Sequence, residues 1–257
     1  MKNKTDFNYP NEDYVTLIKD FYSDINGAAS FTPVREWQSD NWSCSSTCSR
    51  GTVLEKAGFG IMHIAGGTVY QKPGSLKLFE TLAYPVNPRI PGLIFVVNLN
   101  ETEDLGRMVV YLIDLIIQDG KPHDEEKNII SAAVKRICDK HERNFEKRYA
   151  LEPGRLLAGS GAECGIMDFF NEQDIPFLDD LFRESLPAYR EILEIKKNEQ
   201  PQEEDYEEMY RSRARIVEWI TVEDTGVKIA RNNGIPLEET LKSLGIEEVA
   251  KEMQQYI

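Results

Sequence analysis

The sequence has little of what marks nucleic-acid binders and secreted disulfide-rich proteins. Lys and Arg number 30 against 44 Asp and Glu residues, a formal net charge of −14, and no basic run interrupts this acidic background. The electrostatic footprint of a nucleic-acid binder is missing, so we expect neither DNA nor RNA as a partner. Four cysteines in 257 residues are too few to suggest a disulfide framework.

Long apolar runs and linkers are also missing. No stretch reaches the roughly 18 apolar residues of a membrane helix, and residues 1–30 carry charges where a secretory signal would be apolar. No Gly/Ser/Pro-rich linker divides the chain. The sequence therefore predicts a soluble, cytoplasmic protein without membrane contact, folded as a single domain over residues 1–257.

Several catalytic and cofactor motifs do not occur. The chain has no GxGxxG before a helix, no GxxxxGK[ST] loop, no HExxH and no GxSxG, so nucleotide, zinc-protease and serine-hydrolase functions have no support. Cys44 and Cys48 invite a metal interpretation, with His63 as a further ligand in space, but one cysteine pair is weak evidence. We predict no metal and no organic cofactor.

What is present is a β-rich centre from Gly51 to Asn100. Its two halves, 51–67 and 79–100, are rich in β-branched and aromatic residues and are bounded by Gly, Pro and Asn, which predicts neighbouring strands joined by a polar link. Pro85, Pro88 and Pro91 lack the N–H that a ladder needs, so a rigid corner is expected there.

Periodicity predicts the remaining elements. Strands are expected at 31–38, 107–117 and 164–170, with a polar loop at 39–50 and a tight hairpin of two short strands within 217–230. Helices are expected at 11–28, from 124 onward, at 174–195 with Pro187 inside, at 236–244 and from 246 to the C-terminus. The acidic run 199–208 indicates a solvated helix start. Six or seven strands with helices before, between and after them indicate an α+β fold.

Four segments, in order along the chain, resemble the oxygen-dependent coproporphyrinogen III oxidases. They are LEKAG at 54–58, PxNPxxP at 85–91, LPxY at 186–189, and RxRxVE followed by DxGxK at 213–228. The resemblance implies a large, mostly antiparallel β-sheet with helices on both faces, and a homodimer. It also implies a tetrapyrrole substrate and an oxidoreductase of haem (porphyrin) biosynthesis, which decarboxylates porphyrinogen propionates oxidatively with dioxygen as co-substrate.

The resemblance also implies site residues. Asp114 falls where the family has the aspartate that faces the pyrrole nitrogens, which makes it the expected catalytic group; the alternative is an ion pair with Arg107. The expected substrate contacts are Ser45, Ile94, Val96, Asn98, Arg213 and Arg215. For the two arginines, a surface salt-bridge cluster is the alternative, and His123 and His141 are predicted to be solvent-exposed.

The sequence departs from the family at the site itself. A histidine and an arginine of the family's HxNxR triplet are replaced by Ile94 and Asn98, with Val96 between them. These three residues alternate along a strand and share one face, so we expect a pocket over the face that carries Asp114, less cationic than the family's. Two hypotheses follow: an enzyme acting on a porphyrinogen, or a non-catalytic tetrapyrrole carrier or sensor. A ligand-free scaffold is a third.

Overall fold

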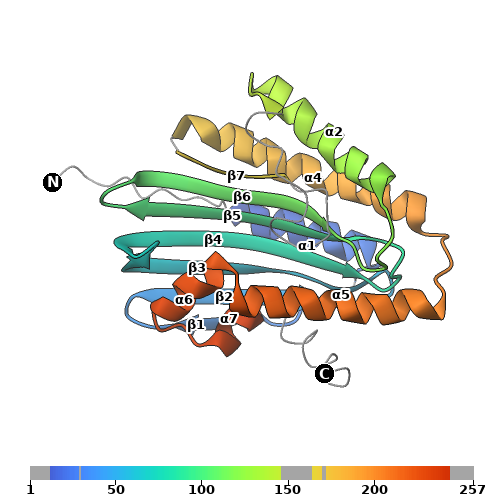
Figure 1. Ribbon diagram of the computed structural model, residues 1–257, viewed down its shortest axis with the longest axis horizontal. Helices are drawn as coiled ribbons and strands as arrows, with labels where there is room; N and C mark the ends of the chain where they lie inside the picture. The colour runs from blue at the N-terminus through green and yellow to red at the C-terminus, as the bar shows by residue number, and fades with distance from the viewer. Residues whose placement is uncertain (1–11, 29, 146–163, 170–171, 244–257) are drawn as a thin grey trace.

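A seven-stranded antiparallel sheet forms the middle of the protein, and its strands lie side by side in sequence order (Figure 1). The computed structural model describes residues 12–28, 30–145, 164–169 and 172–243. The strands are β1 (Arg35–Gln38), β2 (Trp42–Ser49), β3 (Leu54–Val69), β4 (Lys72–Pro85), β5 (Gly92–Thr102), β6 (Gly106–Ile116) and β7 (Cys164–Phe169). The predicted neighbouring strands of the centre are thus β3, β4 and β5.

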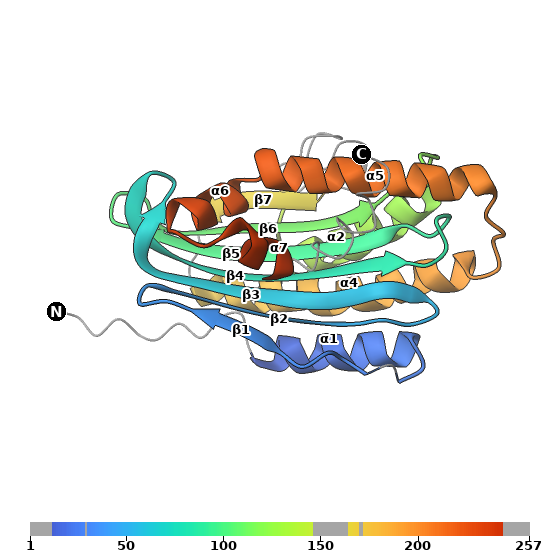
Figure 2. The same ribbon diagram turned by 90° about the horizontal axis from the view of Figure 1, so that it is seen from below.

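Helices cover both faces of this sheet (Figure 2), which confirms the predicted α+β class. They are α1 (Glu12–Ile25), α2 (Asp124–Lys140), α4 (Ile175–Lys196), α5 (Glu203–Val222), α6 (Thr225–Asn232) and α7 (Leu237–Ser243). The first three lie on one side and the last three on the other. No helix in the described ranges is long and apolar enough to cross a membrane.

Strand alternation assigns every sheet residue to one of two faces. Phe79, Phe95 and Tyr111 belong to the larger apolar cluster with α1, α2 and α4, and we call that side the α4 face. Leu82 and Ile94 belong to the cluster that α5 closes, and we call that side the α5 face. The mostly apolar packing of the α4 face marks it as the principal core.

Helix α1 shows why the sequence folds this way. Tyr14, Ile18 and Tyr22 recur every four residues and are fully buried on the α4 face. The Tyr14 ring stacks on Phe182 of α4 with centroids 4.1 Å apart. The Tyr22 hydroxyl lies 2.7 Å from the Thr81 hydroxyl of β4, so helix and strand are joined by polar as well as apolar contacts.

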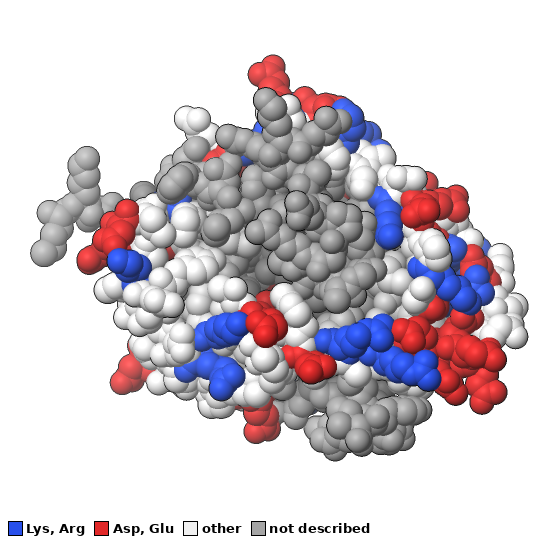
Figure 3. Space-filling view, viewed as in Figure 1, with Lys and Arg blue, Asp and Glu red and all other residues white. Residues whose placement is uncertain are grey.

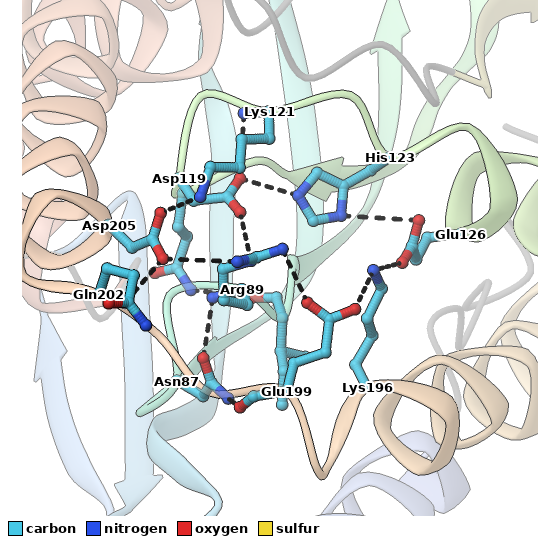
Figure 4. A network of polar contacts seen from close by, with 12 residues as sticks. Asn87, Arg89, Asp119, Lys121, His123, Glu126, Lys196, Glu199, Gln202 and Asp205 are labelled. Carbon is cyan, nitrogen blue, oxygen red and sulfur yellow. Dashed lines mark hydrogen bonds and ion pairs between the residues drawn. The ribbon is translucent and has the colours of Figure 1, made fainter.

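The predicted proline corner follows β4 and is fixed by an ionic network (Figure 4). Arg89 in the corner reaches Glu199 at 3.1 Å, Asp119 at 3.4 Å and Asp205 at 3.7 Å. Asp119 follows β6, Glu199 lies in the link from α4 to α5, and Asp205 lies in the first turn of α5. One guanidinium therefore joins three connections at the same end of the sheet.

The same network holds His123, which the sequence predicted to be exposed. That prediction was wrong: His123 is buried, with Nε2 2.8 Å from Asp119 and Nδ1 3.6 Å from Glu126. The two flanking carboxylates make burial of the imidazole tolerable. His141 is largely covered as well, and its ring nitrogen lies 2.6 Å from Asp180.

The predicted polar loop at 39–50 is instead strand β2. It pairs with β3 over its whole length on one side, and with the short β1 through residues 43–46 on the other. Small Ser, Thr and Cys side chains have weak strand propensity, but pairing with neighbours on both sides outweighs it. The predicted strand at 31–38 is shorter, since only Arg35–Gln38 enters the sheet as β1, and the polar link is taken up by the β3–β4 hairpin.

The predicted hairpin within 217–230 is wrong, because this stretch ends α5 and forms α6. Ile216 and Ile220 are one helical turn apart and both are buried, so their β-branched character misled the interpretation. Asp224, taken as a turn residue, is the N-cap of α6, and its carboxylate accepts a hydrogen bond from the Val227 N–H at 2.7 Å. The expected helix after residue 246 lies outside the described residues.

Candidate functional site

The α5 face carries an unusual concentration of buried polar side chains. Asp114 on β6 is 0 % exposed, and it lies directly opposite Ile94 of β5 in the sheet register. Val96 and Asn98 follow on the same face of β5, as the alternation predicted. The structure therefore brings together four of the residues proposed from the sequence.

Glu80 on β4 belongs to this face, because it lies opposite Val96. Its side chain is buried, and Oε1 has no hydrogen-bond partner among the described residues. Burial raises the Glu80 pKa well above the ordinary range, and the nearby Asp224 carboxylate raises it further. Burial thus favours the protonated form of Glu80 over the carboxylate.

Two amides extend the acceptor surface along β5. Asn98 and Asn100 are buried on the α5 face, and the Oδ1 atom of each has no hydrogen-bond partner among the described residues. The Asn100 amide nitrogen donates to the Asn98 backbone carbonyl at 3.3 Å. A buried acceptor without a donor costs on the order of 1–3 kcal/mol. Three such atoms on one face suit a ligand that brings N–H groups.

Asp224 supplies a second perturbed carboxyl group from the helical side. It caps α6 through the Val227 N–H, yet burial raises its pKa above the ordinary value despite hydrogen bonds from the Val227 and Gly226 N–H groups. The negative charge of Asp224 in turn raises the cost of ionising Glu80. Paired carboxyls with displaced pKa values are typical of proton-transfer sites.

Sheet geometry sets the distance between Glu80 and Asp114. The two residues are separated by two strand spacings and by two residues along the strand. With strands about 4.8 Å apart and a rise of about 3.4 Å per residue, their Cα atoms are about 12 Å apart. One flat, multi-ring ligand on this face could therefore meet both carboxyl groups.

The structure separates Ser45 from this group. Ser45 of β2 lies opposite Ile61, and its row continues through Phe79 and Val97 on the α4 face. The neighbouring Ser46 is the β2 residue in the Glu80 row. Placed on the far side of the sheet from Asp114, Ser45 cannot share a ligand surface with it.

Arg213 of α5 is buried at 1 % exposure and already has its partners. Its guanidinium donates to Glu55 at 2.7 Å, to the Gln118 side chain at 2.9 Å and to the Pro85 carbonyl at 3.2 Å. It also lies over the Tyr84 ring, 5.3 Å from the centroid. These contacts engage the guanidinium that was expected to bind a propionate. Arg213 instead connects α5 to the end of the sheet.

Arg215 points outward and pairs with Glu208 at 2.7 Å, with about half of its side chain exposed. Figure 3 shows acidic side chains gathered over the beginning of α5, with basic side chains farther along the helix. The exposed acids there include Glu203, Glu204 and Glu207, which agrees with the predicted solvated helix start. Arg215 therefore matches the alternative prediction, a surface salt-bridge cluster, and not a substrate contact.

The alternative partner of Asp114 was Arg107. Seven residues separate them on β6, so their side chains lie on opposite faces and their Cα atoms are about 23 Å apart. Arg107 lies 3.5 Å from Glu101. Asp114 Oδ1 accepts a hydrogen bond from the Leu115 N–H at 2.7 Å. Strand geometry thus excludes the Arg107 pair.

The cysteines of β2 do not assemble a metal site. Cys44 and Cys48 are free thiols on the same face, four residues apart, which separates their Cα atoms by about 13 Å. Burial, and then the charge of Glu239, raise the pKa of the Cys44 thiol to about 12. In the described ranges no group of three or more His, Cys, Asp and Glu side chains could hold a metal ion.

Sequence reasoning missed Glu80 and Asp224. Glu80 stands inside FETLAYP, between apolar residues at alternate positions, and a charged residue at a position expected to face a core is the signal that would have found it. The same signal did identify Asp114. Asp224 was hidden because the hairpin interpretation gave it a turn role.

The fold and the site together define a class of protein. It has an antiparallel seven-stranded sheet between two helical layers, with buried carboxyl groups on one covered face of the sheet. No family model matches the chain, and no curated protein matches it. Among solved structures, phytochromobilin synthase from tomato in complex with biliverdin is similar, with a TM-score of 0.62 and 13% identity. The match covers 92% of this chain and 84% of that chain. Similarity at this identity shows a shared fold.

Proposed function

We propose that the protein binds a tetrapyrrole on the α5 face of its sheet and acts on it as an oxidoreductase. The observation that carries the proposal is the set of buried acceptors, with Glu80 and Asp114 about 12 Å apart on one face. The ligand class is supported by the shared fold, since the similar structure holds biliverdin, and by the sequence resemblance to a porphyrinogen oxidase family.

The buried acceptor oxygens of the α5 face suit the N–H groups of a tetrapyrrole. The inner edge of a tetrapyrrole presents N–H groups, and an N–H group bound by a buried carboxylate or amide oxygen relieves the cost of burying that oxygen. Asn98 and Asn100 offer such oxygens in adjacent rows of the α5 face, and Asp114 lies two rows beyond Asn98 on the same face. The apolar neighbours Ile94 and Val96 would lie against the ring carbons.

Proton transfer fits the carboxyls. Reducing one double bond of a linear tetrapyrrole takes two electrons and two protons. The electrons have to come from an external reductant, while a neutral Glu80 with its raised pKa can supply a proton at neutral pH. Asp224, whose pKa is also raised, lies near enough for its charge to raise the pKa of Glu80. Proton-coupled reduction of a linear tetrapyrrole is therefore the reaction that we favour.

The second candidate reaction is the oxidative decarboxylation of porphyrinogen propionates with dioxygen. It is favoured by the position of Asp114, buried opposite Ile94, where the resemblance puts the pyrrole-facing acid. The cations expected to hold propionates do not lie with it, because Arg213 is engaged with Glu55 and Arg215 is at the surface. This distribution of charge makes decarboxylation the weaker candidate.

Binding is tested by titrating biliverdin, haem and coproporphyrin III and following absorbance. We expect biliverdin to bind, and Asp114→Asn to weaken it about tenfold, since an amide NH2 group, which cannot accept a hydrogen bond, replaces one acceptor oxygen. Arg211→Met changes a charge elsewhere on α5, at an exposed residue, and should bind like the wild type. If Asp114→Asn and Arg211→Met bind biliverdin as tightly as the wild type does, the proposed face is wrong.

Turnover is tested separately. Biliverdin with dithionite under anaerobic conditions, and coproporphyrinogen III in air, distinguish the two reactions by their products. Glu80→Gln retains hydrogen bonding but has no transferable proton, so binding should persist while reduction slows by about 10²-fold or more. Binding without turnover of either substrate would instead support the carrier or sensor hypothesis.

A further inference from the structure

Asn233, at the C-terminal end of α6, holds this helix to strand β3 by its side-chain amide. Its Oδ1 accepts from the Thr68 N–H at 2.7 Å, and its Nδ2 donates to the Thr68 carbonyl at 2.8 Å. The Nδ2 also donates to the Ile229 carbonyl at 2.8 Å, which fixes the side chain against its own helix. One amide thus satisfies both backbone groups of a strand residue, as a neighbouring strand would.

The backbone of β3 is adapted to this contact. A register shift interrupts the β3–β4 ladder between Ile64 and Gly67, and Gly66 has a φ of +71°. A Cβ atom on Gly67 would lie 2.0 Å from Asn233 Oδ1, so the amide needs a glycine there. The bulge and the two glycines turn the Thr68 backbone groups toward the helix.

Helix α6 covers Glu80. Leu78 and Leu82 flank Glu80 on the α5 face of β4; Leu82 shares an apolar cluster with Val227, and Leu78 shares one with Ile229. The helix therefore passes over the position between the two leucines. Glu80 is 4 % exposed, so a ligand can reach its free Oε1 only if this cover moves.

Helix α5, the longer part of the same cover, is fastened differently. Arg213 binds three groups of the sheet end, and the Ser212 hydroxyl donates to the Ile117 carbonyl at 2.7 Å. By contrast, α6 and α7 are short, and Gly234 between them has a φ of +79°. The cover thus consists of one helix held by several polar contacts, followed by two short helices joined by a glycine turn.

We propose that α6 and α7 form a lid over Glu80, and that the Asn233 amide on Thr68 is its latch. Opening breaks the two hydrogen bonds to Thr68 and swings the lid about the junction at Glu223, between α5 and α6. Closing restores them and shields the carboxyl groups from water. As an access route to the acid site the lid rests on the proposed function, while its opening is a property of the free protein.

Hydrogen exchange of the free protein tests the latch. Asn233→Ala should speed amide exchange in α6 about tenfold or more, since the two hydrogen bonds to Thr68 no longer hold the closed state. Exchange in β4, β5 and α5 should stay unchanged. Thr68→Ala is the matched control, because it keeps both backbone groups that bind Asn233. Gly67→Ala is the second variant: it displaces the amide sterically and should open the lid with Asn233 intact.

Stopped-flow binding of biliverdin tests the lid. Asn233→Ala should raise both the association and the dissociation rate about threefold or more, because each passes through the open state. Unchanged α6 exchange in both Asn233→Ala and Gly67→Ala overturns the latch, and faster exchange with unchanged association overturns the lid as an access route. If the wild type binds no tetrapyrrole, the proposed function fails, and the latch is judged on the exchange of the free protein alone.

Discussion

Replacing Arg213 by methionine should destabilise the protein severely, since the residue is buried and all its polar partners are defined. Methionine fills much of the same volume but leaves the Gln118 side-chain oxygen and the Pro85 carbonyl without their donor. Gln118 is fully buried and Pro85 is buried as well, so each lost donor costs about 1–3 kcal/mol.

Two further contributions to the loss of stability are smaller. Glu55 is about a quarter exposed and can be solvated after its partner is gone, so that pair adds about 1 kcal/mol. The contact with the Tyr84 ring is worth about 0.5–2 kcal/mol. Allowing for relaxation, we expect the free energy of unfolding to fall by about 3–5 kcal/mol, the range for removing one partner from a buried ion pair.

Urea unfolding followed by circular dichroism measures this loss, and Arg215→Met on the same helix is the matched control. Arg215 is half exposed and pairs with Glu208 at the surface, so its loss should cost no more than about 0.5 kcal/mol. The reasoning fails if Arg213→Met lowers stability by less than about 1 kcal/mol, or if the two variants are equally destabilised.

Four other predictions concern titration, ligand preference and assembly. Because the pKa of Glu80 is raised in the fold, the wild type loses stability as pH rises from the unfolded-state pKa to the folded-state pKa of this group. Glu80→Gln lacks this titration, so its stability relative to the wild type should increase by about 1.4 kcal/mol for each pH unit of that interval. Equal pH profiles of unfolding for the two proteins would contradict this. For Asp119, burial opposes ionisation, but hydrogen bonds from His123 and the Lys121 N–H lower its pKa. Its stabilisation is therefore present at neutral pH and lost as pH falls through the folded pKa, so Asp119→Asn should cost about 1.5–3 kcal/mol at pH 7 and little at acidic pH in parallel urea titrations. With Arg213 engaged, less carboxylated tetrapyrroles should bind at least as well as coproporphyrin III, and dissociation constants favouring the tetra-acid tenfold would contradict this. The homodimer stays a prediction that light scattering at micromolar concentration checks, since β1 and β7 are the edges of the described sheet and exposed edges favour pairing.

The sheet was largely predictable because its central strands are rich in β-branched and aromatic residues, and because side chains alternate between the two faces of any strand. This alternation also placed Ile94, Val96 and Asn98 on one face, and the structure shows Asp114 on that face too. The secondary-structure predictions were wrong where local sequence propensity competes with long-range packing. The Ser-rich β2 has low strand propensity, and its pairing with β1 and β3 is a long-range effect.

The C-terminal half of the site could not be predicted for a related reason. Ile216 and Ile220 suit a strand or a helix, and only packing against the sheet decides between them. Asp224 followed by Gly226 suits a turn as well as a helix start. The coupling of Asp224 to Glu80 depends on α6 lying over β4, a contact between segments more than 140 residues apart that no local pattern contains.

The motifs behind the porphyrinogen oxidase resemblance meet at one end of the sheet, away from the acids. Arg213 from the RxR motif binds Glu55 from LEKAG and the carbonyl of Pro85, the first residue of PxNPxxP. The Tyr189 hydroxyl from LPxY donates to the carbonyl of Pro91, the last residue of the same motif, at 3.1 Å. The resemblance therefore follows a set of contacts that fixes the corner and both helical layers.

A shared corner of this kind constrains the fold and leaves the chemistry free. The residues that differ from the porphyrinogen oxidase pattern, Ile94 and Asn98, lie on the α5 face together with Glu80, which no motif contains. The proposed activity therefore depends on the side chains of the α5 face and not on the shared corner. This face has buried oxygens without a donor among the described residues, and the pKa of Glu80 there is raised, whereas the guanidinium expected to hold a propionate is bound at the corner. For the proposed tetrapyrrole, this distribution of charge favours binding through the pyrrole nitrogens, with the carboxylates left toward solvent.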